Sequence, residues 1–325
     1  MGGGTVLISL PKEWVKRQNI GKGSILVVES SVNENLLIYP FRTEEARMKE
    51  TTITYSTSYP QGLINQITGA YLLGQDIIKI QGKERISYQG RDIIKNAMKQ
   101  LVGLEIVEED AYYITTQFLL EPTTLNPEKI IRRMHLIARG MYRDAIISLL
   151  ERDEYLFKVI NQRDDEVDRL YFLLVRLIRS AVTNPKLANK YGLSNIELLD
   201  YRVAANLLET VGDASVELTD SVPDLASFYI EDYLRDALKN ASEYLGDMQD
   251  SAVKVFLSKG ADDARQVVRL YNNLTQTLEK FKLTIMNNQS QKVAELLSIF
   301  SAINKIRRCN VDIADLVVPM LAIIT

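Results

Sequence analysis

The feature that most constrains the fold is a repeat in the second half of the chain. The sequence "VDRLY" at 167–171 returns as "VVRLY" at 267–271, and "VGDA" at 211–214 aligns with "NVDI" at 310–313. The helices expected before the first motif pair agree in their apolar positions at the same offset. Matches that keep register in this way predict a duplicated three-helix unit. Two such units are expected to pack as antiparallel helices with heptad-like seams.

The chain before the repeat changes character twice. Residues 5–10, 25–29 and 36–40 have the apolar, β-branched composition of strands, and Pro11 opens a short helix. Residues 42–125 alternate strand patterns with amphipathic helices, which indicates a small α/β domain. "NPEK" then marks a helix start, with Asn126 as N-cap. We expect a mainly α protein with domains at 1–41, 42–125, 126–222 and 223–325.

Composition excludes several classes of function. The chain has 325 residues, a net charge of −3, one cysteine and one histidine. Disulfide frameworks, Cys-based zinc sites and most catalytic triads are therefore ruled out. No apolar run reaches the ~18–20 residues of a membrane span, and the N-terminus does not have the pattern of a signal peptide. These features favour a cytoplasmic protein without stable membrane insertion.

An acidic stretch, "RDDEVDRLYFLLVR" at 163–176, carries the candidate chemistry. Asp164 and Asp168 continue the line of an apolar helix seam, whereas Asp165 and Glu166 are expected to point elsewhere. Two ionised carboxylates beside a seam repel each other and lose solvation, and a divalent cation would offset both costs.

A second acidic pair has the same spacing on the third helix of the unit. Glu209 and Asp213 flank Gly212, a poor helix former that permits close approach of a backbone or ligand. Two carboxylates from each of two facing helices form an all-oxygen donor set, which favours magnesium, manganese, calcium or iron over zinc. The alternative is a solvated helix face, because acid pairs at this spacing are common in a chain with 25% charged residues.

The stretches "RDDEVDRLYFLLVRLIRSAV" and "YRVAANLLETVGDAS", together with the tandem repeat, resemble the PhoU family of phosphate-uptake regulators. The Glu/Asp-x-x-x-Asp motif of that family corresponds to Asp164–Asp168 and Glu209–Asp213. The N-terminal "GGGTVLISLPKEWVKRQNIGKGSILVVE" is similar to a swapped-hairpin SpoVT/AbrB-type DNA-binding domain. This order of domains resembles the archaeal form of the regulator.

The resemblance implies a fold and a function. It implies two PhoU-type three-helix bundles, hard metal ions (Mg, Mn or Fe) on the acidic motifs, and repression of phosphate uptake through a phosphate ABC transporter ATPase or a sensor kinase. It also implies a homodimer formed through the N-terminal hairpin, and DNA as a ligand of that hairpin. No enzymatic activity is implied.

The second repeat departs from the motif. The matching positions hold Ala264, Val268, Arg308 and Asp312, so three of the four acids are missing. We therefore expect one metal site, in repeat 1. Arg308 beside Asp312 suggests an internal ion pair instead.

The N-terminal segment carries few basic side chains. The candidate phosphate contacts are Lys12, Lys16, Arg17 and Lys22, and the net charge of the first forty residues is only +1. Such a group supports salt-dependent phosphate contacts as well as it supports a solvated helix face.

Four further residues have structural interpretations. We expect Trp14 to be core of the hairpin dimer, His135 to be structural or exposed, and Cys309 to be packing. Tyr171, one turn from Asp168, is a candidate hydrogen-bond donor to a metal ligand.

Three functions stay open at this point. The first is a dimeric, metal-carrying regulator, the second a carboxylate-bridged metalloenzyme on a helical bundle, and the third a metal-free helical adaptor. Metal content separates the third from the others, and turnover separates the second from the first.

Overall fold

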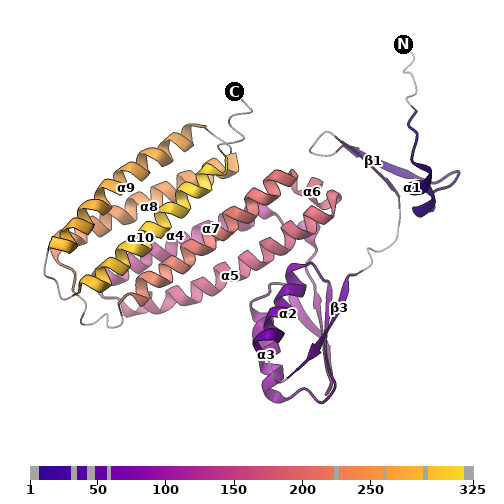
Figure 1. The fold of residues 1–325 in the computed structure, drawn as a ribbon, viewed down its shortest axis with the longest axis horizontal. Coiled ribbons are helices and arrows are strands. Elements are labelled where there is room, and N and C mark those ends of the chain that lie inside the picture. Colours follow the sequence, from indigo (N-terminus) through magenta and orange to yellow (C-terminus); the bar gives the residue numbers. More distant parts are fainter. Residues whose placement is uncertain are drawn as a thin grey trace, which may run out of the picture.

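The structure is a computed structural model that describes residues 7–30, 35–41, 48–56, 60–222, 227, 229–258, 261–287 and 292–317. It is mainly α, as predicted. Figure 1 shows a long helical body, a small α/β unit beside it, and an N-terminal hairpin unit at one end of the body. No helix in these ranges is both long enough and apolar enough to cross a bilayer.

The N-terminal unit contains the short helix α1 (Lys12–Arg17) and the antiparallel strands β1 (Leu26–Ser30) and β2 (Leu36–Pro40). None of the α1 residues is buried. Several large apolar side chains of this unit are exposed to solvent, including Leu7 at 91% and Ile25 at 68% exposure. A unit this small buries too little surface to be stable alone.

The strand expected at residues 5–10 is not present in the described part of that segment. Residues 7–10 have no regular secondary structure, and residues 5–6 lie outside the described residues. A β-strand exists only where its backbone groups find a hydrogen-bonded neighbour. Among the described residues, 7–10 have no such neighbour, so the predicted strand is not found in the described part of this segment.

The α/β unit has the predicted alternation of strands and helices. Its elements are β3 (Glu50–Tyr55), α2 (Pro60–Leu72), β4 (Ile77–Gly82), α3 (Tyr88–Lys99), β5 (Leu104–Glu109) and β6 (Tyr113–Phe118). The sheet order is β3-β4-β6-β5, with β3 and β4 parallel and the other pairs antiparallel. Buried Ile53, Ile80 and Ile114 lie opposite one another across three strands, because alternate residues of a strand face one side.

The first helical unit comprises α4 (Pro127–Glu151), α5 (Glu154–Thr183), the short α6 (Pro185–Tyr191) and α7 (Asn195–Asp220). Local sequence sets each start. The Asn126 side chain accepts from Lys129 N at 3.1 Å, as predicted, and Ser194 forms a capping box with Glu197 before α7. Helices α4, α5 and α7 pack against one another.

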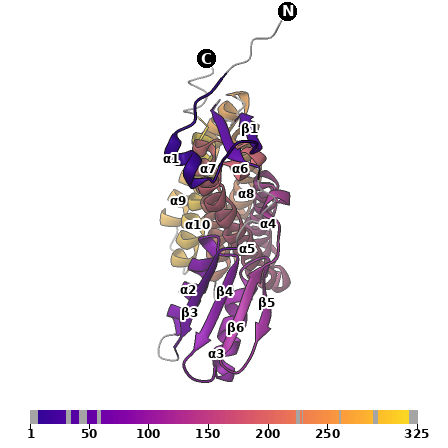
Figure 2. The same cartoon turned by 90° about the vertical axis from the view of Figure 1, so that its right-hand side faces the viewer.

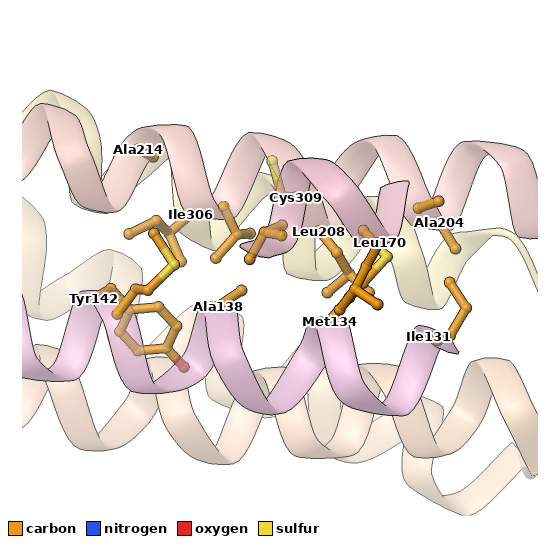
Figure 3. Packing of buried hydrophobic residues seen from close by; sticks show 14 of the residues in the cluster. Ile131, Met134, Ala138, Tyr142, Leu170, Ala204, Leu208, Ala214, Ile306 and Cys309 are labelled. Atoms are coloured by element: carbon orange, nitrogen blue, oxygen red, sulfur yellow. The ribbon is translucent and has the colours of Figure 1, made fainter. Parts of the chain in front are cut away.

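The second helical unit comprises α8 (Asp232–Ser258), α9 (Ala261–Asn287) and α10 (Val293–Asp315). The order of long helices repeats that of the first unit, which is the duplication expected from the sequence. Contacts of α10 with α7 and of α8 with α4 join the two units into one body. Figure 3 shows part of their common apolar core, in which Met134, Leu208 and Ile306 come from three different helices.

The α/β unit is attached to α5 by a buried arginine. Arg176 is 2% exposed, and its guanidinium donates to Tyr71 O at 2.7 Å and to Gln75 O at 2.9 Å. The same group lies 3.9 Å from the ring centroid of Phe118. In Figure 2 the α/β unit lies below the helical body, and α2 contacts α5.

The predicted boundaries between domains remain predictions. Those at 41/42 and 222/223 adjoin residues outside the described ranges, and the one at 125/126 lies just before α4.

Candidate metal centre

Helices α5 and α7 carry the four predicted ligands. Asp164 and Asp168 lie one turn apart on α5, and Glu209 and Asp213 lie one turn apart on α7. All four side chains are partly buried where these two helices pack together. The sequence spacing of four therefore predicts the shared face correctly.

Gly212 allows Asp164 to approach the backbone of α7. A Cβ atom at position 212 would lie 3.0 Å from Asp164 Oδ1 and 3.6 Å from Val167 Cγ1. The close approach anticipated at this glycine is therefore made by a carboxylate from the facing helix. An alanine here would force the carboxylate to move by a few tenths of an ångström.

The carboxylates influence one another strongly. Burial, followed by the charges of neighbouring acids, raises the pKa of Asp164 to about 7 and that of Asp168 to about 6. Burial and then Asp213 raise the pKa of Glu209 to about 7, and burial also raises the pKa of Asp213. Crowded acids that resist ionisation mark a place where a cation is electrostatically favoured.

The donor chemistry fits a hard cation, whereas the present arrangement does not yet form a coordination shell. Asp164 Oδ1 is buried and has no hydrogen-bond partner among the described residues, so this oxygen is available to coordinate a cation. Within the described residues, no three His, Cys, Asp or Glu side chains are grouped so that they could hold a metal ion as they stand. Binding would therefore require the carboxylates of α5 and α7 to turn toward a common point.

A lysine from the second repeat lies beside this group. Lys305 on α10 donates to Glu217 Oε1 at 2.6 Å, and its charge lowers the pKa of Asp213 against the effect of burial. No sequence pattern indicated this residue, because Lys305 lies outside the repeated motif and meets α7 only through packing of the two repeats.

The neighbouring acids Asp165 and Glu166 face away from the centre, as expected, but they are not simply solvated. Asp165 accepts a hydrogen bond from Gln100 Nε2 at 3.2 Å, and Glu166 forms an ion pair with Arg133 of α4. The acidic stretch of α5 thus contacts the end of α3, helix α4 and helix α7.

The role proposed for Tyr171 is wrong in this structure. Its hydroxyl donates to Asn206 Oδ1 at 3.2 Å rather than to a carboxylate, and Arg202 lies over its ring. Cys309 is buried as predicted, and burial raises the pKa of its thiol to about 11. His135 has a structural role, since its Nε2 lies 3.2 Å from Asp250 Oδ1 on α8.

The equivalent positions of repeat 2 do not gather acids in the described part of the chain. Val268 is 59% exposed, and Arg308 and Asp312 are exposed on α10. The described residues show no salt bridge between Arg308 and Asp312, so the expected ion pair is not formed, although the Arg308 charge lowers the pKa of Asp312 against burial and Asp315. The side chain of Ala264 lies outside the described residues.

The candidate DNA-contacting residues lie at the surface of the N-terminal unit. Lys12, Lys16 and Arg17 are exposed on α1, and Lys22 is exposed in the loop after it. This geometry permits phosphate contacts, and it equally describes a solvated helix.

Comparison with known proteins identifies a matching family and a similar solved structure. Residues 131–222 match the family model described as the PhoU domain. The crystal structure of PhoU from Pseudomonas aeruginosa matches with 15% sequence identity and a TM-score of 0.49, over 60% of this chain and 95% of that chain. No curated protein matches. The segment that carries all four carboxylates is thus similar to the PhoU domain.

Proposed function

We propose that this chain is a PhoU-like regulator of phosphate uptake. The observation that carries the proposal is that the PhoU domain match, over residues 131–222, contains all four facing carboxylates of α5 and α7. In this proposal the protein works in the cytoplasm as a regulator rather than an enzyme. It couples phosphate status to the phosphate ABC transporter ATPase, to a sensor kinase, or to both.

The proposed regulator carries a hard metal ion in repeat 1. Asp164, Asp168, Glu209 and Asp213 would hold magnesium, manganese or iron, whose charge would neutralise the carboxylates and tie α5 to α7. The raised pKa values and the unpartnered Asp164 Oδ1 support this assignment. Repeat 2 would carry no equivalent ion.

The N-terminal unit is proposed to form an AbrB-like homodimer. The exposed Leu7 and Ile25 and the lack of a strand partner for residues 7–10 in the described part of the chain support association through this unit. Lys12, Lys16, Arg17 and Lys22, doubled in a dimer, would contact DNA phosphates. Retardation of labelled DNA that weakens steeply as salt rises would support this contact. Equal retardation by a variant with all four residues changed to Gln would overturn it.

Metal content is the test of the centre. We would incubate the purified chain with magnesium, manganese and iron and measure bound metal by mass spectrometry, beside a variant with Asp164 and Asp168 changed to Asn. The matched control is Asp165→Asn, which removes an acid of the same helix that faces Gln100. Metal in the wild type and the control, and loss in the double variant, is expected. Empty wild-type protein would leave the metal-free adaptor as the better description.

Phosphate uptake is the test of the regulatory role. Cells that lack the chain should take up more phosphate than wild-type cells when phosphate is plentiful. Wild-type protein and Asp165→Asn should restore repression, and the Asp164/Asp168 double variant should not. Unchanged uptake in cells lacking the chain would refute the role. Turnover of a phosphoester by the metal-loaded protein would favour the metalloenzyme instead.

A further inference from the structure

A groove of about 470 Å³ runs between α4 and α8, where the two repeats meet. It is separate from the four carboxylates, which lie between α5 and α7. Its polar lining residues are Arg139, Tyr142 and Arg143 of α4, and Lys239, Ser242, Glu243 and Asp247 of α8.

Contacts between the two helices hold the groove at both ends. At one end Arg235 of α8 donates to Leu150 O at 2.7 Å. At the other end Asp250 of α8 accepts from Arg139 Nη2 at 3.1 Å and lies 3.2 Å from His135 Nε2. These contacts set the distance between α4 and α8 before any ligand binds. Less conformational entropy is therefore lost when a ligand binds between them.

Two buried donors beside the groove have no acceptor in the described part of the chain. Tyr142 is fully buried, and neither its hydroxyl nor Arg139 Nε has a hydrogen-bond partner. In Figure 3 the Tyr142 hydroxyl points away from the apolar side chains around its ring. Burial raises the pKa of this phenol, so it keeps its proton and remains able to donate. Buried polar groups are nearly always paired, and these two donors both lack an acceptor.

Two unpaired cations lie at the mouth of the groove. Arg143 and Lys239 are exposed, and neither forms an ion pair with a described residue. Gly246 faces Arg139, where a Cβ would lie 3.3 Å from Arg139 Nη2, so a larger residue would crowd the guanidinium. The acids of the groove, Glu243 and Asp247, are exposed on the α8 side, where water screens them.

We propose that this groove binds an oxyanion of the phosphate type, either free inorganic phosphate or a phosphoryl group on a larger molecule. Arginine suits this ligand because its planar fork donates two parallel hydrogen bonds to a phosphate. Arg139 and Tyr142 both line the groove, so an anion bound there would meet their two unpaired donors. The ligand would join α4 of one repeat to α8 of the other.

Calorimetric titration of the full chain tests the site. Inorganic phosphate, pyrophosphate and tripolyphosphate are titrated in turn, with sulfate for comparison and with a chelator present to remove metal. Binding of inorganic phosphate would identify the free ion as the ligand, and binding of the longer anions alone would identify a larger phosphoryl compound. Arg143→Gln and Lys239→Gln should each weaken binding by about ten-fold. Glu243→Gln should strengthen it, because it removes a repelling charge.

Two control variants accompany the titration. Arg269→Gln, which removes an exposed charge on α9, should leave binding unchanged. Absence of binding by all three phosphates, or equal weakening by Arg269→Gln and Arg143→Gln, would overturn the proposal. Asp168→Asn should not alter binding, which keeps this test independent of the metal centre.

Tyr142→Phe provides a second readout. Without ligand this variant should melt at a higher temperature, because it removes a buried hydroxyl that has no partner. The stabilisation that phosphate gives should become smaller. An undiminished stabilisation by phosphate would show that the hydroxyl does not contact the anion, and would refute the argument from the unpaired donors.

Discussion

Replacing Asp164 by Asn should change how the stability of the metal-free protein depends on pH. The pKa of Asp164 is raised from 3.8 to about 7, chiefly by burial and then by the charges of Asp168 and Asp213. A raised carboxylate pKa means that the folded state holds the proton more tightly than the unfolded chain does. The carboxyl therefore stabilises the fold fully at low pH, relative to its ionised form, and this advantage is lost as pH rises through about 7.

The size of the effect follows from the pKa change. A change from 3.8 to about 7 corresponds to at most about 4 kcal/mol. Water reaches this half-buried group and screens its charge, so we expect about 1–2 kcal/mol. Asn cannot ionise. Replacing Asp164 by Asn therefore also removes the repulsion that its charge exerts on the neighbouring acids. The variant should consequently lose less stability than wild type between about pH 4 and pH 7, the interval between the unfolded and folded pKa values of Asp164.

The assay is urea unfolding at a series of pH values, with a chelator present throughout. Asp165→Asn is the matched control, since it removes an exposed acid of the same helix whose carboxylate contacts Gln100. We expect the wild type and the control to lose stability across this range, and Asp164→Asn to lose distinctly less. A wild type whose stability is flat or rises over the range would refute the account of crowded carboxylates. Parallel curves for wild type and Asp164→Asn would refute the role of this residue.

Three further predictions follow from the contacts described. Gly212→Ala should weaken metal binding measured by titration, because its Cβ would displace the Asp164 carboxylate. In the metal-free fold the higher helix propensity of alanine, ~1 kcal/mol, offsets this strain. Undiminished metal affinity would contradict the prediction. Arg176→Met should cost about 2–4 kcal/mol in urea unfolding, since buried carbonyls lose their donor, whereas Arg179→Met on the exposed face of α5 should cost little; equal costs would be the contrary result. Ile25→Asp should yield monomers by light scattering if the N-terminal unit pairs two chains, and a persisting dimer would rule out that interface.

Much of the architecture could be predicted from short-range sequence information. Asn126 and Pro127 mark the start of α4 because capping depends only on neighbouring residues. The spacing of Asp164 and Asp168 identified the face of α5 that meets α7, because helix geometry converts spacing directly into direction. The repeat predicted the two three-helix units for the same reason.

Features that depend on distant parts of the chain could not be predicted in this way. Lys305 reaches the carboxylates only because α10 packs on α7, and Arg176 is buried only because the α/β unit lies on α5. Tyr171 has the right spacing for a carboxylate contact, but its hydroxyl donates its hydrogen bond to Asn206 on α7 instead. The strand expected at 5–10 depends on a hydrogen-bonding neighbour that residues 7–10 do not find among the residues that the structure describes.

The attachment of the α/β unit has a consequence for communication within the molecule. Gln100 donates a hydrogen bond to Asp165, and Gln75 in the loop before β4 accepts one from Arg176. One continuous helix, α5, therefore carries both of these contacts and the carboxylates of Asp164 and Asp168. Asp168 and Arg176 are separated by only about 12 Å of helix axis. No hinge or loop lies between them to absorb a displacement. A ligand that tilts the α/β unit would therefore move the carboxylates of α5 against those of α7, and a cation bound between them would resist that tilt with the same free energy.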